Sequence, residues 1–319
     1  MTAFMGWSWI RRAAMLGVAL LALARPLSAT EDKPLGFGLI STQPAGVLAE
    51  QWGPIVDDLS SALGRPVRMQ FFTDYAGVIH SLQAGEIQLA WTGNKAAILA
   101  VDRARSEVFA QKVDLGGSEG YRSYLIVHRH SGLASVAETM ARADQLTLGF
   151  GDPNSTSGTL VPGYYLFAQQ GGDPRRLFKR VLQANHEQNM TAVAERRVDA
   201  ATVASATYDR VCAARPSVCA DHRIIWESPV IPGDPLLWRV ELPEDLKSRI
   251  RQFFVDYGSE GPEKAAALTG EQRRRLSAIG ASRFRPSDDR QLAPVRELET
   301  FYSQNRTAAV KSTDTATTR

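Results

Sequence analysis

The 319-residue chain has little of several features that would define a function class. Only two cysteines are present, Cys212 and Cys219, too few for a disulfide-rich scaffold or, with the nearby His222, for the four ligands of a closed zinc site. The apolar run from Ala13 to Ala24 is shorter than the roughly 20 residues that a transmembrane helix needs. The formal charge is only +3, so nothing indicates binding to nucleic acid or membrane by charge alone.

The first residues are typical of a secretory signal peptide. Arg11 and Arg12 precede the apolar run, and the string PLSA, ending at Ala29, offers a small residue at the cleavage point. We therefore expect residues 1–29 to be removed on export. Removal takes away three arginines and no acidic residue, so the formal charge of the mature chain falls from +3 to zero. At the other end, residues 305–319 are rich in Thr, Ala and Ser and are predicted to be disordered.

The most informative stretch is QLTLGFGDPNSTSGTLVPGYYLFA, residues 145–168, which predicts a buried strand, a turn and a helix. Ser155, Thr156 and Ser157 lie between the strand and the helix. A helix start leaves about four backbone N–H groups unpaired and carries partial positive charge, and hydroxyl groups add donors. A phosphate-like anion can therefore bind there without a cation. The alternative is that Ser155 or Thr156 only caps the helix.

Strand and helix patterns alternate along the roughly 290 residues of the mature chain, which is enough for two domains. Strands are predicted at 35–40, 67–72, 87–91, 124–127, 146–150, 179–182, 198–203 and 223–226. Helices are predicted at 47–63, 75–84 and 95–103, with others beginning near Gly158, His186 and Ser205, and the signal from Pro243 onward is helical. The helix near Gly158 is expected to hold Pro162 in its first turn. The pattern indicates an α/β fold with parallel sheets covered on both faces and ligands at the carboxyl ends of the strands.

The two cysteines lie close together in VCAARPSVCADH. In an exported protein this spacing favours a local disulfide, with two free thiols as the next alternative and a metal site last. No metal and no cofactor are expected.

Several segments in order resemble one known family. They are FGLISTQPAGVLAEQWGPIVDDL, FFTDYAGVIHSLQAGEIQLAWTGN, VFAQKVDLGGSEGYRSYLIV, GDPNSTSGTLVPGYY, ANHEQNMTAVAERRVDAAT and IIWESPVIPGDPLLWR, which together cover nearly all of the mature chain up to about Phe301. The chain is similar to the periplasmic solute-binding proteins of ABC transporters for phosphonate, phosphite and phosphate, and most of all to the phosphonate-binding branch.

The resemblance implies a two-lobed, type II venus-flytrap fold in the periplasm that closes on its ligand and delivers it to a membrane permease. Lobe 1 would comprise residues 30–123 and 228–304, and lobe 2 residues 124–227. Two hinge crossovers would join the lobes, near residues 121–126 and 224–229. The protein is expected to be a monomer with a small phosphorus oxyanion as ligand and no nucleic acid partner.

The resemblance also implies the ligand-binding residues. Ser155, Thr156 and Ser157 would cradle the phosphonate from the second lobe, together with His186, while Tyr75 and Tyr121 would close from the first lobe. Taken alone, each tyrosine could be a core aromatic and His186 a helix cap or surface residue. Trp91, at a strand end, could be a packing residue or part of the ligand wall.

Asp234, in IPGDP, carries information on ligand choice, because a carboxylate repels an anion unless it faces a ligand proton or ammonium group. In the phosphonate-binding branch, the carboxylate at this position is implied to act with a glutamate on the ligand amine. Ala206 occupies the position of that glutamate, and Thr92 stands where the family often has an aromatic residue. Weaker binding of 2-aminoethylphosphonate is therefore expected, unless Asp209, one helical turn away, supplies the second carboxylate.

Two other function classes are open to the same residues. Ser155, His186 and Asp234 are the residue types of a serine hydrolase, but no G-x-S-x-G elbow surrounds Ser155, so no enzymatic activity is expected. An exported sensory module that presents the same anion to a membrane receptor would have the same binding site. The sequence also leaves phosphite and phosphate open as ligands in place of an organophosphonate.

Overall fold

The computed structural model describes residues 33–168, 172–259 and 266–302. The chain divides after Lys33, and the described helices and strands belong to the unit that begins at Pro34. The predicted signal peptide, 1–29, and the predicted disordered tail, 305–319, lie outside the described residues.

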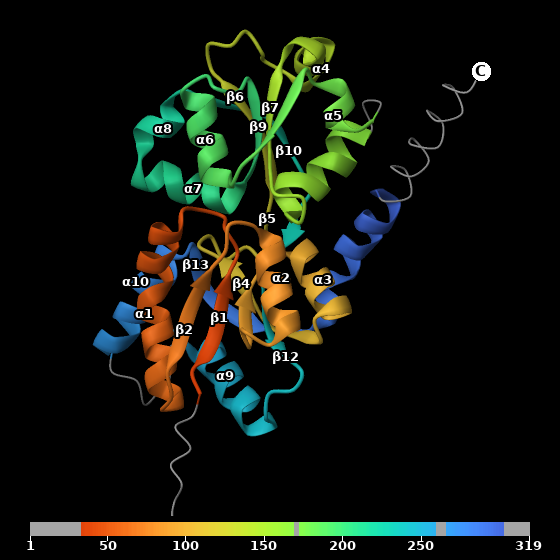
Figure 1. Ribbon diagram of the computed structural model, residues 1–319. Helices are drawn as coiled ribbons and strands as arrows, with labels where there is room; N and C mark the ends of the chain where they lie inside the picture. The colour runs from red at the N-terminus through yellow and green to blue at the C-terminus, as the bar shows by residue number, and fades with distance from the viewer. Residues whose placement is uncertain (1–32, 169–171, 260–265, 303–319) are drawn as a thin grey trace, which may run out of the picture. The chain divides into compact units, whose positions relative to one another are not determined.

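The elements alternate between strands and helices (Figure 1). The six-stranded sheet has the order β13-β4-β12-β3-β1-β2, the five-stranded sheet has the order β10-β6-β9-β7-β8, and β11 and β5 form a two-stranded sheet. The strands are β1 Leu35–Leu39, β2 Val67–Phe71, β3 Leu89–Trp91, β4 Ser106–Asp114, β5 Gly120–Tyr121, β6 Ser123–His128, β7 Thr147–Phe150, β8 Arg180–Gln183, β9 Ala200–Ala204, β10 His222–Glu227, β11 Ile231–Pro232, β12 Pro235–Arg239 and β13 Ala281–Pro286.

The helices lie against the faces of these sheets (Figure 1). They are α1 Ala45–Leu63, α2 Tyr75–Ala84, α3 Asn94–Arg103, α4 Val136–Ala141, α5 Pro174–Leu177, α6 His186–Ala194, α7 Ser205–Ala214, α8 Pro216–Ala220, α9 Glu244–Asp256 and α10 Ala266–Ala278, with π-helical segments at Thr156–Leu160 and Gly163–Phe167 and a last helix at 293–302. The α2 helix has the predicted bounds, and the strands expected before residue 230 are all present to within a few residues.

Each sheet has its own apolar core. In the six-stranded half, Phe37 packs edge-on against Trp52 of α1, with ring centroids 5.6 Å apart, and Phe254 of α9 packs against the same strand residue. In the five-stranded half, Leu148 and Phe150 of β7 are buried in a separate cluster. Full burial of each such side chain stabilises the fold by about 1.5 to 3 kcal/mol, so each half holds its sheet rigidly.

The expectation of purely parallel sheets is wrong. Strands β1, β2 and β3 are parallel, as are β7, β8 and β9, but β12 and β13 are antiparallel to β4, and β6 is antiparallel to β9 and β10. The physical reason is where the chain crosses between the sheets. It leaves the six-stranded sheet at the carboxyl end of β4 and returns at the same edge, so the returning strand β12 must run in the opposite direction.

The crossings bring the ends of many strands to one edge. The chain passes from β4 to β6 between Asp114 and Ser123, and back from β10 to β12 between Glu227 and Pro235, while β5 and β11 pair with each other on the way. The predicted lobe ranges stay a prediction, and their boundaries lie beside Ser123 and Glu227. The carboxyl ends of β1, β3 and β4 thereby lie at the same edge as the amino end of β12.

The predicted disulfide is confirmed: Cys212, near the end of α7, is bonded to Cys219 in α8. The bridge ties two short consecutive helices together. No helix among the described residues is both long and apolar enough to cross a bilayer.

Gly233 provides a stability test of the return crossing. A Cβ atom there would lie 2.1 Å from the carbonyl oxygen of Lys112, so Gly233→Ala must push β4 and the start of β12 apart. We expect a loss of about 1 to 3 kcal/mol in the free energy of unfolding. Gly46→Ala is the matched control, because a Cβ at that exposed position in α1 meets nothing within 4 Å. Urea denaturation measures both, and equal stability of the two variants would contradict the close approach.

Candidate functional site

All seven residues predicted to bind the ligand line one pocket. Tyr75 and Tyr121 come from α2 and β5, Ser155, Thr156 and Ser157 from the segment after β7, His186 from the start of α6, and Asp234 from the turn before β12. The cavity leaves about 20 Å³ for the centre of a water-sized molecule, little more than one water needs, so the lining residues pack closely around it. The other lining residues are Ile40, Thr42, Trp91, Gly93, Lys112, Ala204, Ala206, Thr207 and Arg210.

Two of the three hydroxyl groups in the segment after β7 accept backbone hydrogen bonds and keep their protons for other partners. The Ser155 Oγ accepts from the Gly158 N–H at 3.0 Å, which makes Ser155 the cap of the helical segment. The Thr156 Oγ1 accepts from the Lys95 N–H of α3 at 2.9 Å. Each hydroxyl has one O–H to donate. Capping and ligand binding are therefore compatible roles for Ser155.

The helical segment does not begin where the sequence indicated. It begins at Thr156, two residues before Gly158, so Pro162 is its seventh residue and lies beyond the first turn. A proline there has no N–H for the carbonyl of Gly158 or, in a π-helical pattern, for that of Ser157.

Other groups bond the two carbonyls that Pro162 leaves free. The Gly158 oxygen accepts from the Gly151 N–H at 3.0 Å and from the Thr202 hydroxyl of β9 at 2.7 Å. The Ser157 oxygen accepts from the Ser123 hydroxyl of β6 at 2.6 Å. These bonds fix the hydroxyl segment to the five-stranded sheet.

The two tyrosines are both buried and both reach this segment. Tyr75 is 3% exposed and its phenol contacts Ser155, while Tyr121 is 7% exposed and its phenol contacts Ser157 and Asp234. Burial, together with the nearby Asp234 charge, raises the pKa of each phenol well above its usual range. Both groups therefore stay protonated and can donate hydrogen bonds.

His186 is held as a neutral ring. It is the first residue of α6, whose start is fixed by a capping box between Asn185 and Gln188. Its Nδ1 accepts from the Ala204 N–H at 3.3 Å, so the proton of the neutral ring is on Nε2. Burial lowers the pKa of the ring to about 4, and the Arg210 charge acts in the same direction. At neutral pH His186 is thus a neutral N–H donor.

Asp234 is the one carboxylate that lines the pocket among the described residues. Burial raises its pKa to about 6, against the opposing effects of the Lys112 charge and the hydrogen bond from Tyr121. Its Oδ1 is buried without a hydrogen-bond partner among the described residues. Three further buried polar atoms of the lining share that property: Thr42 Oγ1, Trp91 Nε1 and Arg210 Nε.

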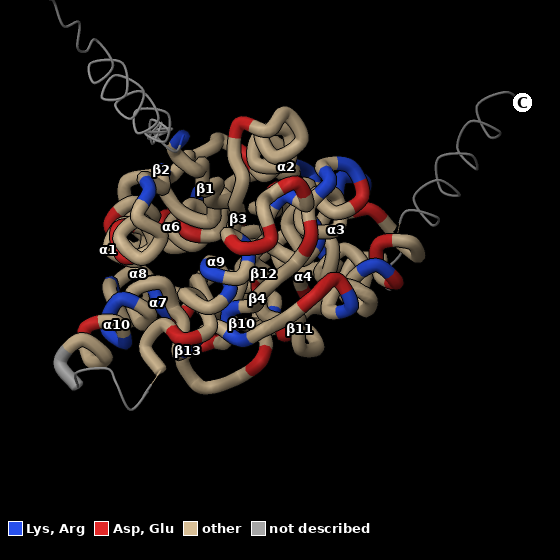
Figure 2. Tube along the Cα trace, turned by 90° about the horizontal axis from the view of Figure 1, so that it is seen from below, with Lys and Arg blue, Asp and Glu red and all other residues tan. Residues whose placement is uncertain are grey.

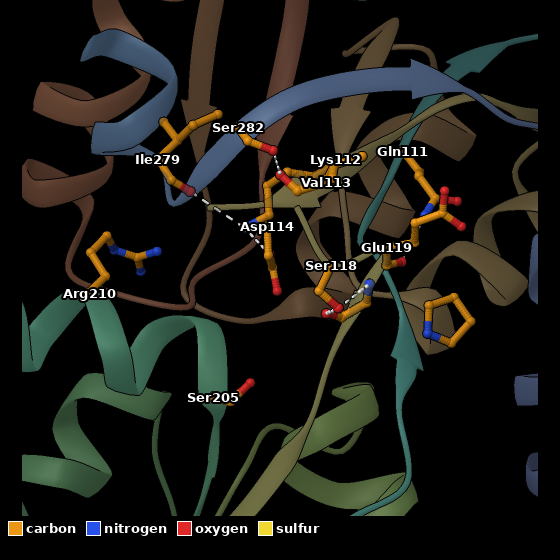
Figure 3. Close-up of polar contacts among 12 residues, drawn as sticks. Gln111, Lys112, Val113, Asp114, Ser118, Glu119, Ser205, Arg210, Ile279 and Ser282 are labelled. Atoms are coloured by element: carbon orange, nitrogen blue, oxygen red, sulfur yellow. Dashed lines mark hydrogen bonds and ion pairs between the residues drawn. The ribbon is translucent and has the colours of Figure 1, made fainter. Parts of the chain in front are cut away.

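Two cations, Lys112 and Arg210, also line the pocket, and neither was predicted from the sequence. Lys112 lies on β4 and is only 3% exposed, and Arg210 extends from α7 toward the end of β4 that carries Asp114 (Figure 3). The signal was present, because Lys112 interrupts the apolar run VFAQKV, and a lysine is almost never buried without a partner.

Of the other residues considered in the sequence, two line the pocket and two do not. Trp91 and Ala206 line the pocket. Asp209 is exposed on α7 and Thr92 is fully buried, and both lie outside the lining. Asp209 therefore does not supply a second carboxylate there. The described residues contain no group of three or more His, Cys, Asp or Glu side chains that could hold a metal ion.

The neutral state of His186 predicts a specific pH dependence. Between its folded pKa of about 4 and the ordinary histidine pKa of 6.5, the unfolded chain binds more protons at this ring, so its contribution to stability falls as pH falls. Asp234, with a raised pKa of about 6, acts in the opposite direction, so the parent must be compared with a variant. We expect the stability of the parent relative to His186→Gln to fall by about 1 to 2 kcal/mol from pH 7 to pH 5. Urea denaturation at both pH values measures this, and a constant difference would refute the neutral ring.

Comparison with known proteins gives a consistent result. Residues 37–292 match the family described as "ABC transporter, phosphonate, periplasmic substrate-binding protein". The chain is 42% identical over 284 residues to the phosphonates-binding periplasmic protein of Escherichia coli (strain K12), covering 89% of this chain and 81% of that protein.

Solved structures agree with this match. A binding-protein component of an ABC phosphonate transporter from Pseudomonas aeruginosa is 42% identical, with a TM-score of 0.81 over 86% of this chain and 88% of the other. PhnD1 of Prochlorococcus marinus, in complex with methylphosphonate, shares the fold at 20% identity, with a TM-score of 0.74 over 85% of this chain and 98% of the other. The chain therefore belongs to the family of periplasmic substrate-binding proteins of phosphonate ABC transporters, with their two-lobed type II fold.

Proposed function

We propose that the pocket binds a small phosphonate through its phosphonyl oxygens, with Ser155, Thr156, Ser157, Tyr75, Tyr121, His186 and Asp234 as the binding residues. The observation that carries the proposal is the convergence of these residues, from five separate parts of the chain, on one pocket. Six of them are neutral hydrogen-bond donors, and the hydroxyls of Ser155 and Thr156 each accept one backbone N–H and keep an O–H. Their free protons therefore suit an acceptor-rich anion.

Asp234 has a separate part in this proposal. A carboxylate beside a phosphonate is repelled unless a proton lies between the two groups. Its pKa of about 6 and its unpartnered Oδ1 suit a shared proton, which either the ligand or Asp234 can carry. The carboxyl thus favours a phosphonate that carries a proton over one that is fully ionised.

Hydrogen bonds between the half with the six-stranded sheet and the half with the five-stranded sheet support a coupling of ligand binding to closure of the two halves. The Lys95 N–H bonds Thr156, the Tyr75 N–H bonds Asp152 at 3.1 Å, and the Gln43 side chain donates to Glu187 at 2.8 Å. In each pair, one residue belongs to the half with the six-stranded sheet and the other to the half with the five-stranded sheet. A ligand that contacts both Tyr75 and Ser155 would favour this closed arrangement over an open one.

The proposal includes a periplasmic monomer, exported through a signal peptide at 1–29, that delivers its ligand to an inner-membrane ABC permease. No nucleic acid partner is proposed. Figure 2 shows both acidic and basic positions along the described chain, seen from one side. The formal charge of zero for the mature chain gives no net attraction to a phosphate backbone.

Two conservative variants test the hydroxyl cradle. Thr156→Val and Ser157→Ala each remove one donor and leave a ligand oxygen unsatisfied, so each should weaken methylphosphonate binding by about 1 to 3 kcal/mol. Calorimetric titration of the purified mature protein measures this, with phosphate, phosphite and 2-aminoethylphosphonate titrated in parallel. Thr300→Val, at an exposed position, is the matched control and should bind like the parent. Parent-like affinity in both pocket variants would place the ligand elsewhere.

Closure has its own measurement. Saturating methylphosphonate should reduce the radius of gyration seen by small-angle X-ray scattering, because the ligand joins donors from both halves. The same concentration should have less effect on Thr156→Val, whose weaker binding leaves more protein open. A scattering profile that does not change, although calorimetry shows the site to be filled, would contradict coupling between binding and closure.

A further inference from the structure

Lys112 is a buried cation whose hydrogen bonds are poorly satisfied. Its Nζ lies 3.4 Å from the Ile279 carbonyl oxygen and 3.6 Å from Asp114 Oδ1, and both distances are long for a charged hydrogen bond (Figure 3). An ammonium group has three N–H donors, and a buried charge is costly unless it is paired and hydrogen-bonded. Because Lys112 lines the pocket, a ligand can reach its remaining donors.

Arg210 lies close to the same place. A Cβ atom on Gly280 would be 3.1 Å from Arg210 Nη1 and 3.8 Å from Lys112 Nζ, so both cationic groups lie against this glycine. One guanidinium nitrogen donates to Gln43, and Nε is buried without a hydrogen-bond partner among the described residues. Two like charges so near each other are stabilised by an anion between them.

Asp114 and Asp234 favour the charged forms of both cations, and Glu187 favours that of Arg210, but only Asp234 lines the pocket. Asp114 lies next to Lys112 but is not part of the lining, and Asp234 is bonded by Tyr121. Ala206, one helical turn before Arg210, contributes no charge. Burial lowers the pKa of Lys112, against the charges of Asp114 and Asp234, and a further anion would favour its charged form.

From these contacts we propose that Lys112, aided by Arg210, makes the pocket selective for a phosphonate that carries a second acidic group, such as a short phosphonocarboxylate. The phosphonyl end would lie at the hydroxyl groups and the carboxylate at the two cations. An ammonium group in the same position would be repelled by both. The inference rests on the proposed phosphonate site and adds the class of its substrate.

The first experiment compares ligands on the parent protein. Phosphonoacetate and phosphonoacetamide have nearly the same shape, but only the first carries a carboxylate. We expect calorimetry to show phosphonoacetate bound about tenfold to a hundredfold more tightly than the amide, the range of a charge-assisted hydrogen bond, and 2-aminoethylphosphonate bound more weakly than either. Equal affinities for the acid and the amide, or a preference for the amine, would overturn the inference.

The second experiment assigns the preference to Lys112. Lys112→Met keeps the length of the side chain and removes its charge, so the ratio of acid to amide affinity should fall close to one. Lys179→Met removes the same charge from an exposed position and should keep the parent ratio. A parent-like ratio in Lys112→Met would show that the lysine only supports Ile279 and Asp114. If the lysine variant does not fold, the parent's ratio and that of Arg210→Gln, which should also fall, decide the matter.

Titration with methylphosphonate distinguishes a wrong substrate class from a wrong binding site. If the parent binds methylphosphonate but does not distinguish the acid from the amide, the substrate class is wrong and the phosphonate site stands. If the parent binds none of the phosphonates, the proposed function fails and the inference fails with it.

Discussion

The structure of the site depends on two carbonyl groups that Pro162 leaves without helical partners. The oxygens of Ser157 and Gly158 are bonded by Ser123, Thr202 and the Gly151 N–H instead, so the segment after β7 is fixed to β6 and β9. A regular α-helix would use those carbonyls internally and have no such anchors. The hydroxyl groups are thereby positioned by the sheet and do not depend on a flexible loop, which is what a pocket of directed donors requires.

The second constraint is the double crossing of the chain. Because both crossings use one edge, the carboxyl ends of parallel strands and the start of β12 meet there, and residues as distant in sequence as Tyr75 and Asp234 line one pocket. The same crossing places Gly233 against the Lys112 carbonyl and brings Lys112 and Asp234 together: the main-chain N–H of Lys112 donates to the main-chain carbonyl of Asp234 at 3.0 Å. The fold thus couples the position of the carboxylate to that of the cation.

Local patterns in the sequence were enough for the helix at 75–84 and for the hydroxyl segment, because each depends on neighbours in the chain. Together with the resemblance, they indicated seven binding residues, all of which line the pocket. The antiparallel strands β12 and β13 could not be predicted, since their direction depends on where a distant segment re-enters the sheet. Arg210 was missed for a similar reason: on a helix of mixed polarity, only the tertiary packing determines which charged side chain faces a pocket. Lys112 was different, because a lysine close to the apolar residues Val108, Phe109 and Val113 of its strand is a visible signal of a buried charge.

The charged groups of the pocket determine which ligands it can distinguish. Neutral donors alone would hold any tetrahedral oxyanion of the right size, because hydroxyl and imidazole N–H groups do not respond to what else the ligand carries. Adding one carboxylate that titrates near pH 6 makes the site sensitive to a proton, and adding two cations makes it sensitive to the sign of a second group. These electrostatic effects are large because the groups are buried away from water. Two charges interact far more strongly in the protein interior than at the surface. Specificity in this pocket is therefore a matter of charge balance beyond the hydroxyl cradle, and it can differ between relatives that share the cradle.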